Sequence, residues 1–175
     1  MELRLEKILL KKVATDISNM FQIRVEKEGL EWEFIFDVDD SVFVNLDIQK
    51  IRQVLINLIS NAIKFRSKSR RLKIEITSQQ LRDSWLIRCQ DNGIGFEPGY
   101  ENKIFEIFQR LHSHQQIPGT GIGLALCRRI MERHGGSIEA QGIPDVGCCF
   151  AMTFPTDTET KAEDTETKAE DNETN

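Results

Sequence analysis

The order in which helical and extended patterns follow one another along the chain limits the folds that it can adopt. Apolar residues recur at helical spacing in three segments and predict helices over residues 3–28, 47–65 and 122–133. Alternating or continuous apolar runs predict strands at residues 32–36, 42–44, 72–78, 85–89, 137–141 and 148–154. These elements lack the regular alternation of a doubly wound sheet. We therefore predict the α+β class, with a two-layer α/β sandwich.

The composition changes abruptly after Pro155. The sequence TETKAED at residues 158–164 is repeated at residues 165–171, and no large apolar residue follows Phe154. Such a segment cannot bury enough apolar surface to offset the entropy of ordering it. We expect one domain over residues 1–155 and a disordered acidic tail over residues 156–175, which is either a dispensable extension or an interaction tail.

The formal net charge of −5 is concentrated in this tail. Residues 156–175 hold eight acids and two lysines and carry −6, which leaves +1 for the rest of the chain. A nearly neutral domain argues against nucleic acid as a partner, and it leaves room for a local cationic pocket.

Cysteines and hydropathy indicate the compartment. The four cysteines form no CxxC pair and do not have metal-ligand spacing with the three histidines, so we expect reduced and mostly buried thiols in a cytoplasmic protein. The charged N-terminus is no signal peptide, and no apolar run approaches the length of a membrane span. We expect no membrane contact from this chain.

The helix predicted over residues 47–65, with Asp47 as its N-cap, carries a polar stripe beside its apolar one. Asn57, Asn61 and Lys64 stand at i, i+4 and i+7 and therefore share one side of the helix. An Asn carbonyl oxygen suits Mg²⁺, and a Lys one turn further on suits a phosphate. The helix alone leaves this interpretation and an ordinary solvated face equally open.

A first glycine-containing segment, Asp91-Asn92-Gly93-Ile94-Gly95, directly follows the apolar run at residues 85–89. Asn-Gly after a strand also occurs in hairpin turns, but no short strand follows here. An Asp at a strand end can accept a hydrogen bond from an exocyclic amine, and neighbouring glycines let the backbone approach a flat base.

A second segment, Gly119-Thr120-Gly121-Ile122-Gly123, leads straight into the third predicted helix. Glycines that deliver backbone N–H groups at a helix N-terminus form an anion site, which the helix dipole strengthens. The segment is not a Walker A loop, and it matches a Rossmann fingerprint poorly because Leu124 stands where the third spaced glycine belongs.

In combination, these segments resemble the GHKL ATP-binding family of histidine kinases, gyrase-type topoisomerases, heat-shock chaperones and MutL-type repair proteins. The histidine-kinase boxes appear in order: an N box at residues 57–65, a G1 box at 91–95, an F box at 104–110, a G2 box at 119–124 and a G3-like end at 147–150. The segment between the F and G2 boxes is similar to that of phytochrome-type and hybrid sensor kinases. The resemblance implies the Bergerat fold, a mixed sheet covered on one face by helices.

The resemblance also implies residue roles. Asn61 would bind Mg²⁺, Lys64 and Arg110 would contact phosphate, Phe65 would pack near the base and Asp91 would bind the adenine amine. The residues expected to bind ATP are Asn57, Asn61, Lys64, Phe65, Asp91, Gly93, Ile94, Gly95, Arg110, Gly119, Thr120, Gly121, Ile122, Gly123 and Leu124. The residues expected to serve catalysis are Asn57, Asn61, Lys64 and Arg110. Phe105 and Phe108 stand three residues apart and would anchor the lid, the segment between the F and G2 boxes, by packing.

Position 57 favours a kinase over an ATPase. In the ATP-hydrolysing branch of the family, the residue four before the Mg²⁺-binding Asn is typically a Glu that activates water, and Asn57 cannot accept that proton near neutral pH. Phosphoryl transfer to an imidazole depends mainly on positioning and charge neutralisation, so it needs no strong base. We expect the ATP-binding catalytic domain of a two-component sensor histidine kinase.

Two departures from the family keep alternatives open. Histidine kinases normally carry the acceptor His on a dimerising helical hairpin upstream, but the segment before Gly29 contains no His. The histidines present, His112, His114 and His134, are unsuited to accept a phosphoryl group. The expected partners are therefore histidine-bearing dimerisation helices outside this sequence and a response regulator receiver domain. Cys148 stands where the family commonly has a Thr or Ser after the last glycine, which puts a direct or water-mediated hydrogen bond to the base in doubt. The alternatives are an ATP-binding regulatory module without kinase activity and an anti-sigma-factor-type serine kinase.

Overall fold

The computed structural model describes residues 3–40, 42–108 and 120–156. The expected tail therefore lies outside the described residues, apart from Thr156. The elements in chain order are β1 (Glu6–Leu9), α1 (Leu10–Lys27), β2 (Trp32–Asp37), β3 (Phe43–Leu46), α2 (Ile48–Lys64), β4 (Leu72–Gln80), β5 (Ser84–Asp91), a 3₁₀ turn η1 (Lys103–Phe105), α3 (Gly123–Arg133), β6 (Ser137–Ile143) and β7 (Gly147–Pro155).

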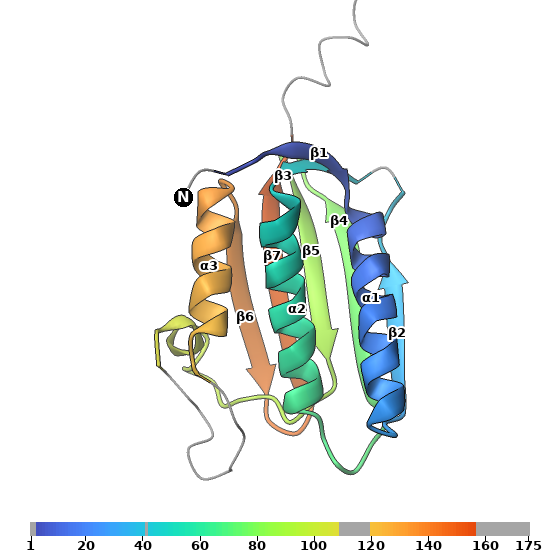
Figure 1. Cartoon of the computed structure of the whole chain (residues 1–175). Helices are drawn as coiled ribbons and strands as arrows, with labels where there is room; N and C mark the ends of the chain where they lie inside the picture. Colours follow the sequence, from blue (N-terminus) through green and yellow to red (C-terminus); the bar gives the residue numbers. More distant parts are fainter. Residues whose placement is uncertain (1–2, 41, 109–119, 157–175) are drawn as a thin grey trace, which may run out of the picture.

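Five strands form a mixed sheet in the order β2-β4-β5-β7-β6. β2 and β4 are parallel, whereas the other neighbouring strands are antiparallel. The helices α1, α2 and α3 lie side by side over one face of this sheet, and the small β1-β3 sheet crosses one end (Figure 1). The predicted α+β sandwich, with helices on one face of a mixed sheet, is confirmed.

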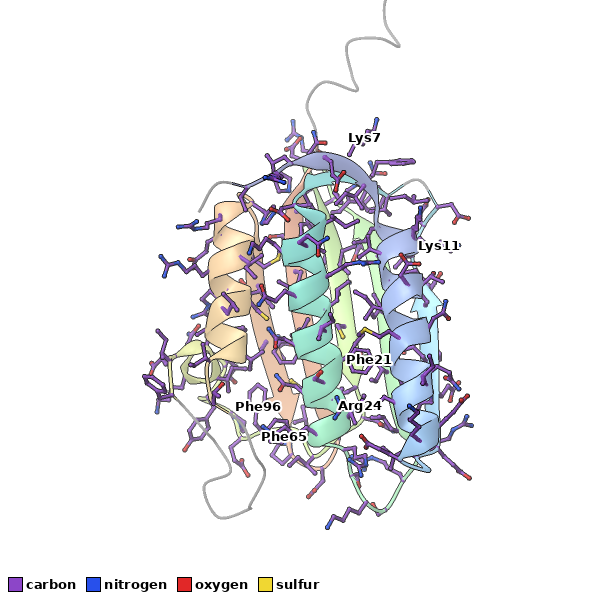
Figure 2. All side chains as sticks on the ribbon, viewed as in Figure 1. Lys7, Lys11, Phe21, Arg24, Phe65 and Phe96 are labelled. Carbon is purple, nitrogen blue, oxygen red and sulfur yellow. The ribbon has the colours of Figure 1, made fainter. Side chains whose placement is uncertain are left out.

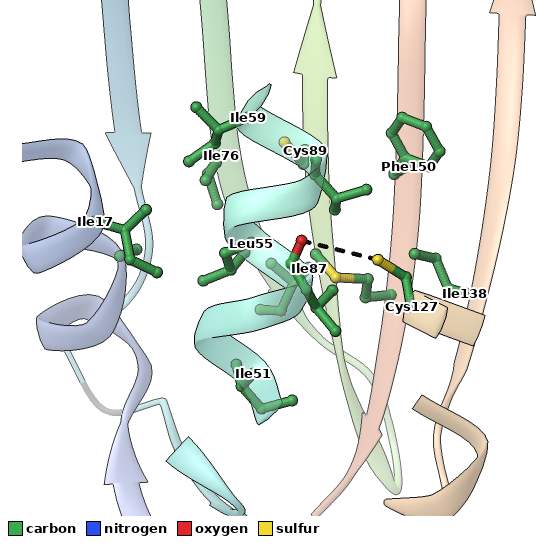
Figure 3. Close-up of a cluster of buried hydrophobic side chains, with 14 of the residues drawn as sticks. Ile17, Ile51, Leu55, Ile59, Ile76, Ile87, Cys89, Cys127, Ile138 and Phe150 are labelled. Carbon is green, nitrogen blue, oxygen red and sulfur yellow. Dashed lines mark hydrogen bonds between the residues drawn. The ribbon is translucent and has the colours of Figure 1, made fainter. Parts of the chain in front are cut away.

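The core lies between this helical layer and the sheet. α2 has its apolar residues at helical spacing and buries Ile51, Val54, Leu55, Leu58, Ile59, Ala62 and Ile63. On α1, Phe21 is buried and points toward α2 (Figure 2). The apolar side chains of α2 meet those of β4, β5 and β7 in one cluster (Figure 3). Among the described residues, no helix has the length and apolar character needed to cross a lipid bilayer.

Two of the four cysteines belong to this core. Cys89 and Cys127 are buried, whereas Cys148 and Cys149 are partly buried, and all four are free thiols. The Cys127 Sγ lies 4.0 Å from the carbonyl oxygen of Val54 (Figure 3). Burial raises the pKa of Cys127 to about 12, so this thiol stays protonated at neutral pH.

The prediction of a single helix over residues 3–28 was wrong at its start. Residues 6–9 form β1, which pairs antiparallel with β3, and the pairing is continued by a hydrogen bond of 3.0 Å from the Leu10 N–H to the Val42 carbonyl. The helix begins at Leu10 without a capping side chain or an acid in its first turn. No local signal therefore marked its start, and partner strand β3 overrides the helical spacing.

The N-terminal end of α2 is joined to the C-terminal end of α3 through Asp47 and His134. The carboxylate of Asp47 caps α2 by accepting from the N–H groups of Gln49 and Lys50, as predicted. The Asp47 N–H donates to Nε2 of buried His134 at 3.0 Å, and Nδ1 of that ring lies 2.7 Å from the Ile130 carbonyl. Because Nε2 accepts, Nδ1 carries the proton, so His134 is a neutral structural residue. His112 and His114 lie outside the described residues.

Candidate functional site

The polar stripe predicted on α2 lies on the C-terminal half of that helix. Asn57, Asn61 and Lys64 are each partly buried, in contrast to the apolar residues beside them. The Lys64 Nζ lies 4.7 Å from the centre of the Phe65 ring, and Phe65 is the residue that ends the helix. The stripe therefore combines two amide side chains and a cation within about two helical turns.

Asp91 is the last residue of β5, and the fold fixes the position of its carboxylate. Oδ1 accepts a hydrogen bond of 2.8 Å from the Gly93 N–H, and the N–H of Cys148, opposite on β7, donates to the same carboxyl group. Burial raises the pKa of Asp91, although these two hydrogen bonds and the charge of Arg70 act against the rise. The result is a partly buried acceptor at the edge of the helical layer.

The turn after Asp91 packs directly on the end of α2. The Ile94 N–H donates to the Phe65 carbonyl at 2.9 Å. A Cβ at Gly93 would lie 2.5 Å from that same carbonyl oxygen, and one at Gly95, where φ is +64°, would lie 2.0 Å from the Ile143 carbonyl. These glycines are thus required by close contact between backbone segments, a reason that differs from the expected approach of a base between them.

The third segment reaches the same place from α3. Gly123 is the first residue of α3, and its carbonyl lies 3.5 Å from Nδ2 of Asn57, the outer limit of a hydrogen bond. Gly121 has φ of +69°, which favours glycine. Within the described residues, no side chain caps this helix and its first turn holds no acid, so a negatively charged group fits there.

The remaining predicted residues of this segment differ in their surroundings. Thr120 and Ile122 are exposed and Leu124 is partly buried. Arg110 and Gly119 lie outside the described residues. Among the described residues, no group of three or more His, Cys, Asp and Glu could hold a metal ion.

Comparison with known proteins identifies the family. A family model described as histidine kinase-, DNA gyrase B- and HSP90-like ATPase matches residues 46–158. The chain belongs to this family. It is a histidine-kinase-type ATPase catalytic domain, as the resemblance implied.

Relatives of this kinase-type domain include phytochrome-like sensor proteins. Phytochrome-like protein Cph1 of Synechocystis sp. is 40% identical over 139 residues, which cover 79% of this chain and 18% of Cph1. The chain therefore spans less than a fifth of this curated relative. The predicted resemblance to phytochrome-type sensor kinases is confirmed.

Solved structures show the same domain. The catalytic domain of histidine kinase ThkA matches with a TM-score of 0.73 and 27% identity, over 87% of this chain and 97% of that one. ThkA in complex with response regulator protein TrrA matches with a TM-score of 0.70 and 27% identity, over 87% of this chain and 42% of that one.

Within the kinase-type domain, the two phenylalanines of the F box have opposite environments. Phe105 is 4% exposed, packs edge-on against Phe150 at 6.3 Å and lies under the Arg128 guanidinium. Phe108 is 74% exposed and has φ of +66°. The predicted packing is confirmed for Phe105 and wrong for Phe108, whereas the lid itself lies outside the described residues. Their spacing of three residues suits one helical face, but the 3₁₀ turn ends at Phe105.

Two residues hold the turns of the site together, and this role was not predicted from the sequence. The side chain of Asn92 accepts from the Lys73 N–H at 2.8 Å and donates to the Arg71 carbonyl at 2.9 Å, which fixes the turn to β4. Arg70 donates to the backbone carbonyl of Asn92 in this turn and to that of Asp145 in the turn between β6 and β7. Asn92 lies inside a recognised motif, whereas Arg70 stands in a run of Arg, Ser and Lys that is typical of a solvated loop.

Proposed function

We propose that this domain binds Mg²⁺-ATP and donates the γ-phosphoryl group to a histidine that lies outside this sequence, as the catalytic part of a two-component sensor kinase in the cytoplasm. A response regulator receiver domain would take the phosphoryl group next. The solved ThkA–TrrA complex, which pairs a histidine kinase with a response regulator protein, supports this choice of partner.

The observation that carries the proposal is the convergence of three segments on the C-terminal half of α2. The turn after Asp91 bonds to the end of α2 through Ile94 and the Phe65 carbonyl. The start of α3 contacts α2 through Gly123 and Asn57. A fixed carboxylate, an amide stripe with a lysine, and a helix N-terminus thus border one region although they are far apart in the sequence.

Each part of Mg²⁺-ATP has a chemically suitable group in this region. The Asp91 carboxylate can accept a hydrogen bond from the exocyclic amine of adenine. Lys64 and the N–H groups at the start of α3 suit the phosphates. The Asn61 carbonyl oxygen would ligate Mg²⁺, which when bound neutralises charge on the phosphate oxygens. Mg²⁺ commonly takes few protein ligands beside substrate phosphates, so one amide oxygen fits.

The proposed reaction needs no protein base at position 57. An imidazole nitrogen of the acceptor forms the bond to the γ-phosphorus while the bond from that phosphorus to the bridging oxygen breaks, and ADP leaves. Asn57 accepts no proton near neutral pH, and it approaches Gly123 at the start of α3. We assign it a role in holding α3 against α2.

The nucleotide site is tested by titrating Mg²⁺-ATP into the wild type and into Asn61→Ala and Asp91→Ala variants. Asn19→Ala is the matched control, because Asn19 is exposed on α1. At about 100 times Kd, ATP should raise the free energy of unfolding of the wild type and the control by about 2.7 kcal/mol. Both site variants should lose most of this gain. Equal stabilisation of all four proteins would reject the site.

The kinase activity needs a separate assay. Radiolabelled ATP is supplied with the isolated histidine-bearing hairpin of a related sensor kinase, and the labelled hairpin is then treated with acid. Acid-labile label on the hairpin supports the proposal. Binding of ATP without any label would instead favour the regulatory module, acid-stable label a serine kinase, and steady hydrolysis without acceptor an ATPase.

A further inference from the structure

The side chain of Arg70 joins two turns that are distant in the sequence. Its Nε donates to the Asn92 carbonyl at 2.7 Å, and its Nη2 donates to the Gly93 carbonyl at 2.8 Å. The same Nη2 also reaches the Asp145 carbonyl at 2.6 Å. The guanidinium thus binds backbone oxygens of the turn after Asp91 and of the turn between β6 and β7. Among the ion pairs formed by described residues, none includes Arg70.

These two turns flank the carboxylate of Asp91. The Gly93 N–H donates to that carboxylate from one turn, and the Cys148 N–H donates from the strand that follows the other. A displacement of either turn therefore changes the direction in which the Asp91 oxygens point. Arg70 fixes the carbonyls of both turns next to these two donors.

The second turn contains a residue in the left-handed region and is held by contacts outside itself. Asp145 has φ of +59°, a region that few non-glycine residues adopt. Its N–H donates to the Ile94 carbonyl at 2.8 Å, and its own carbonyl is the one that Arg70 binds. A guanidinium presents several donors in one plane, which suits a set of carbonyls better than the ammonium of a lysine does.

We propose that Arg70 is a positioning residue of the nucleotide site: it sets the separation between the turn at residues 91–95 and the turn at residues 143–147, and thereby aims the Asp91 carboxylate at the exocyclic amine of adenine. This inference rests on the proposed binding of ATP. Arg70 acts through Asp91 and contacts no nucleotide. Its positive charge also favours the ionised form of that carboxyl group.

The adjacent arginine provides a matched control. Arg71 also donates to a backbone carbonyl, that of Trp32 at 2.8 Å, but this carbonyl belongs to β2 at the edge of the sheet. Loss of Arg71 removes a similar hydrogen bond without touching either turn. Any difference between the two variants therefore reports on the turns.

The experiment compares Mg²⁺-ATP with Mg²⁺-inosine triphosphate, which carries an oxygen in place of the exocyclic amine. Both are titrated calorimetrically into the wild type, Arg70→Ala, Arg70→Lys and Arg71→Ala. In Arg70→Ala the affinity for ATP should fall about tenfold and that for inosine triphosphate less than about twofold. Arg70→Lys should lose ATP affinity to an intermediate extent, and Arg71→Ala should keep the wild-type ratio.

The ratio separates positioning from stability, because a general loss of structure weakens both nucleotides alike. Urea unfolding of each variant identifies any that does not fold, and Arg70→Lys then takes the place of Arg70→Ala. If both Arg70 variants discriminate between ATP and inosine triphosphate as strongly as the wild type does, the Arg70 proposal is overturned. The proposal that the domain binds ATP would be unaffected. A wild type that binds neither nucleotide would overturn the proposed function itself.

Discussion

A buried carboxyl group lies at one end of α2 and a partly buried one lies beside the other, and their roles differ. At the N-terminal end, Asp47 is 7% exposed, caps the helix and is tied to His134, so its polar groups have partners from the fold. Beside the C-terminal end, Asp91 is also held by backbone N–H groups, but the turn that follows it packs on Phe65, whose ring lies 4.7 Å from the Lys64 Nζ. One end serves the fold, and we propose that the other presents acceptors and a cation to the nucleotide.

The pKa shifts of the two acids follow this division. Burial alone would raise the pKa of Asp47, but hydrogen bonds from the N–H groups of Arg4, Lys50 and Gln49 lower it below its ordinary value. For Asp91, burial outweighs the hydrogen bonds and the charge of Arg70, and the pKa is raised. The ionised Asp91 is therefore maintained at a cost in stability, which a donor from a bound base would offset.

Replacing the acid at the ligand end should have the largest effect on binding. In Asp91→Asn, the amide nitrogen cannot accept from the adenine amine, and affinity for ATP should fall about 10-fold to 100-fold. Without nucleotide, the free energy of unfolding should stay equal or rise, because a buried charge has been removed. Calorimetric titration and urea unfolding measure the two effects. Asp37→Asn is the control, because Asp37 is exposed at the end of β2, and undiminished affinity in Asp91→Asn would contradict the assignment.

Replacing the histidine at the other end should reverse this pattern. His134→Ala leaves the Asp47 N–H without its buried acceptor and opens space under α3, so stability should fall by about 1–3 kcal/mol. The affinity for ATP should change by less than about twofold, because the two ends of α2 lie a helix length apart. Urea unfolding and titration provide both values, with exposed Glu132→Ala as the control. A large loss of affinity in a folded variant would show that the ends are coupled.

A smaller loss of stability is expected at the cap itself. Asp47→Ala removes the acceptor for the Gln49 and Lys50 N–H groups and should cost about 0.5–2 kcal/mol. Asp47→Asn keeps a capping oxygen and should cost less. Thermal or urea unfolding distinguishes the two variants. Equal losses would mean that the charge of Asp47, and not its capping geometry, stabilises this end.

Local patterns predicted α2 well along its whole length. The apolar spacing of residues 48–63, the Asp47 cap and the stripe of Asn57, Asn61 and Lys64 are all written within one helix, where neighbours in sequence are neighbours in space. Asp91 was recognisable because it comes after an apolar run and precedes glycines. These features depend on contacts among nearby residues, so the sequence alone contains them.

Contacts between distant residues were not predictable in the same way. β1 forms because β3, more than 30 residues later, offers it a partner, and the helical spacing of its residues gives no sign of this. His134 and Arg70 act through backbone groups of segments far along the chain, and backbone groups leave no signature in a sequence. Gly93 and Gly95 were recognised, but the carbonyls that exclude a side chain there come from Phe65 and Ile143.

The two carboxyl groups should also give stability opposite dependences on pH, the smallest effect expected here. The folded-state pKa of Asp47 is lowered, so its contribution is present above the unfolded value of about 3.9 and is lost as pH falls through the folded one. The pKa of Asp91 is raised, so its contribution is fully present below about 3.9 and is lost as pH rises through the folded value.

Urea unfolding of the wild type, Asp47→Asn and Asp91→Asn from about pH 3 to about pH 7 tests both dependences. The stability advantage of the wild type over Asp47→Asn should shrink toward acid pH. Its advantage over Asp91→Asn should shrink toward neutral pH. Saturating Mg²⁺-ATP should abolish the second trend, because a bound amine favours the ionised carboxylate, whereas two trends of the same sign would contradict the division between the ends of α2.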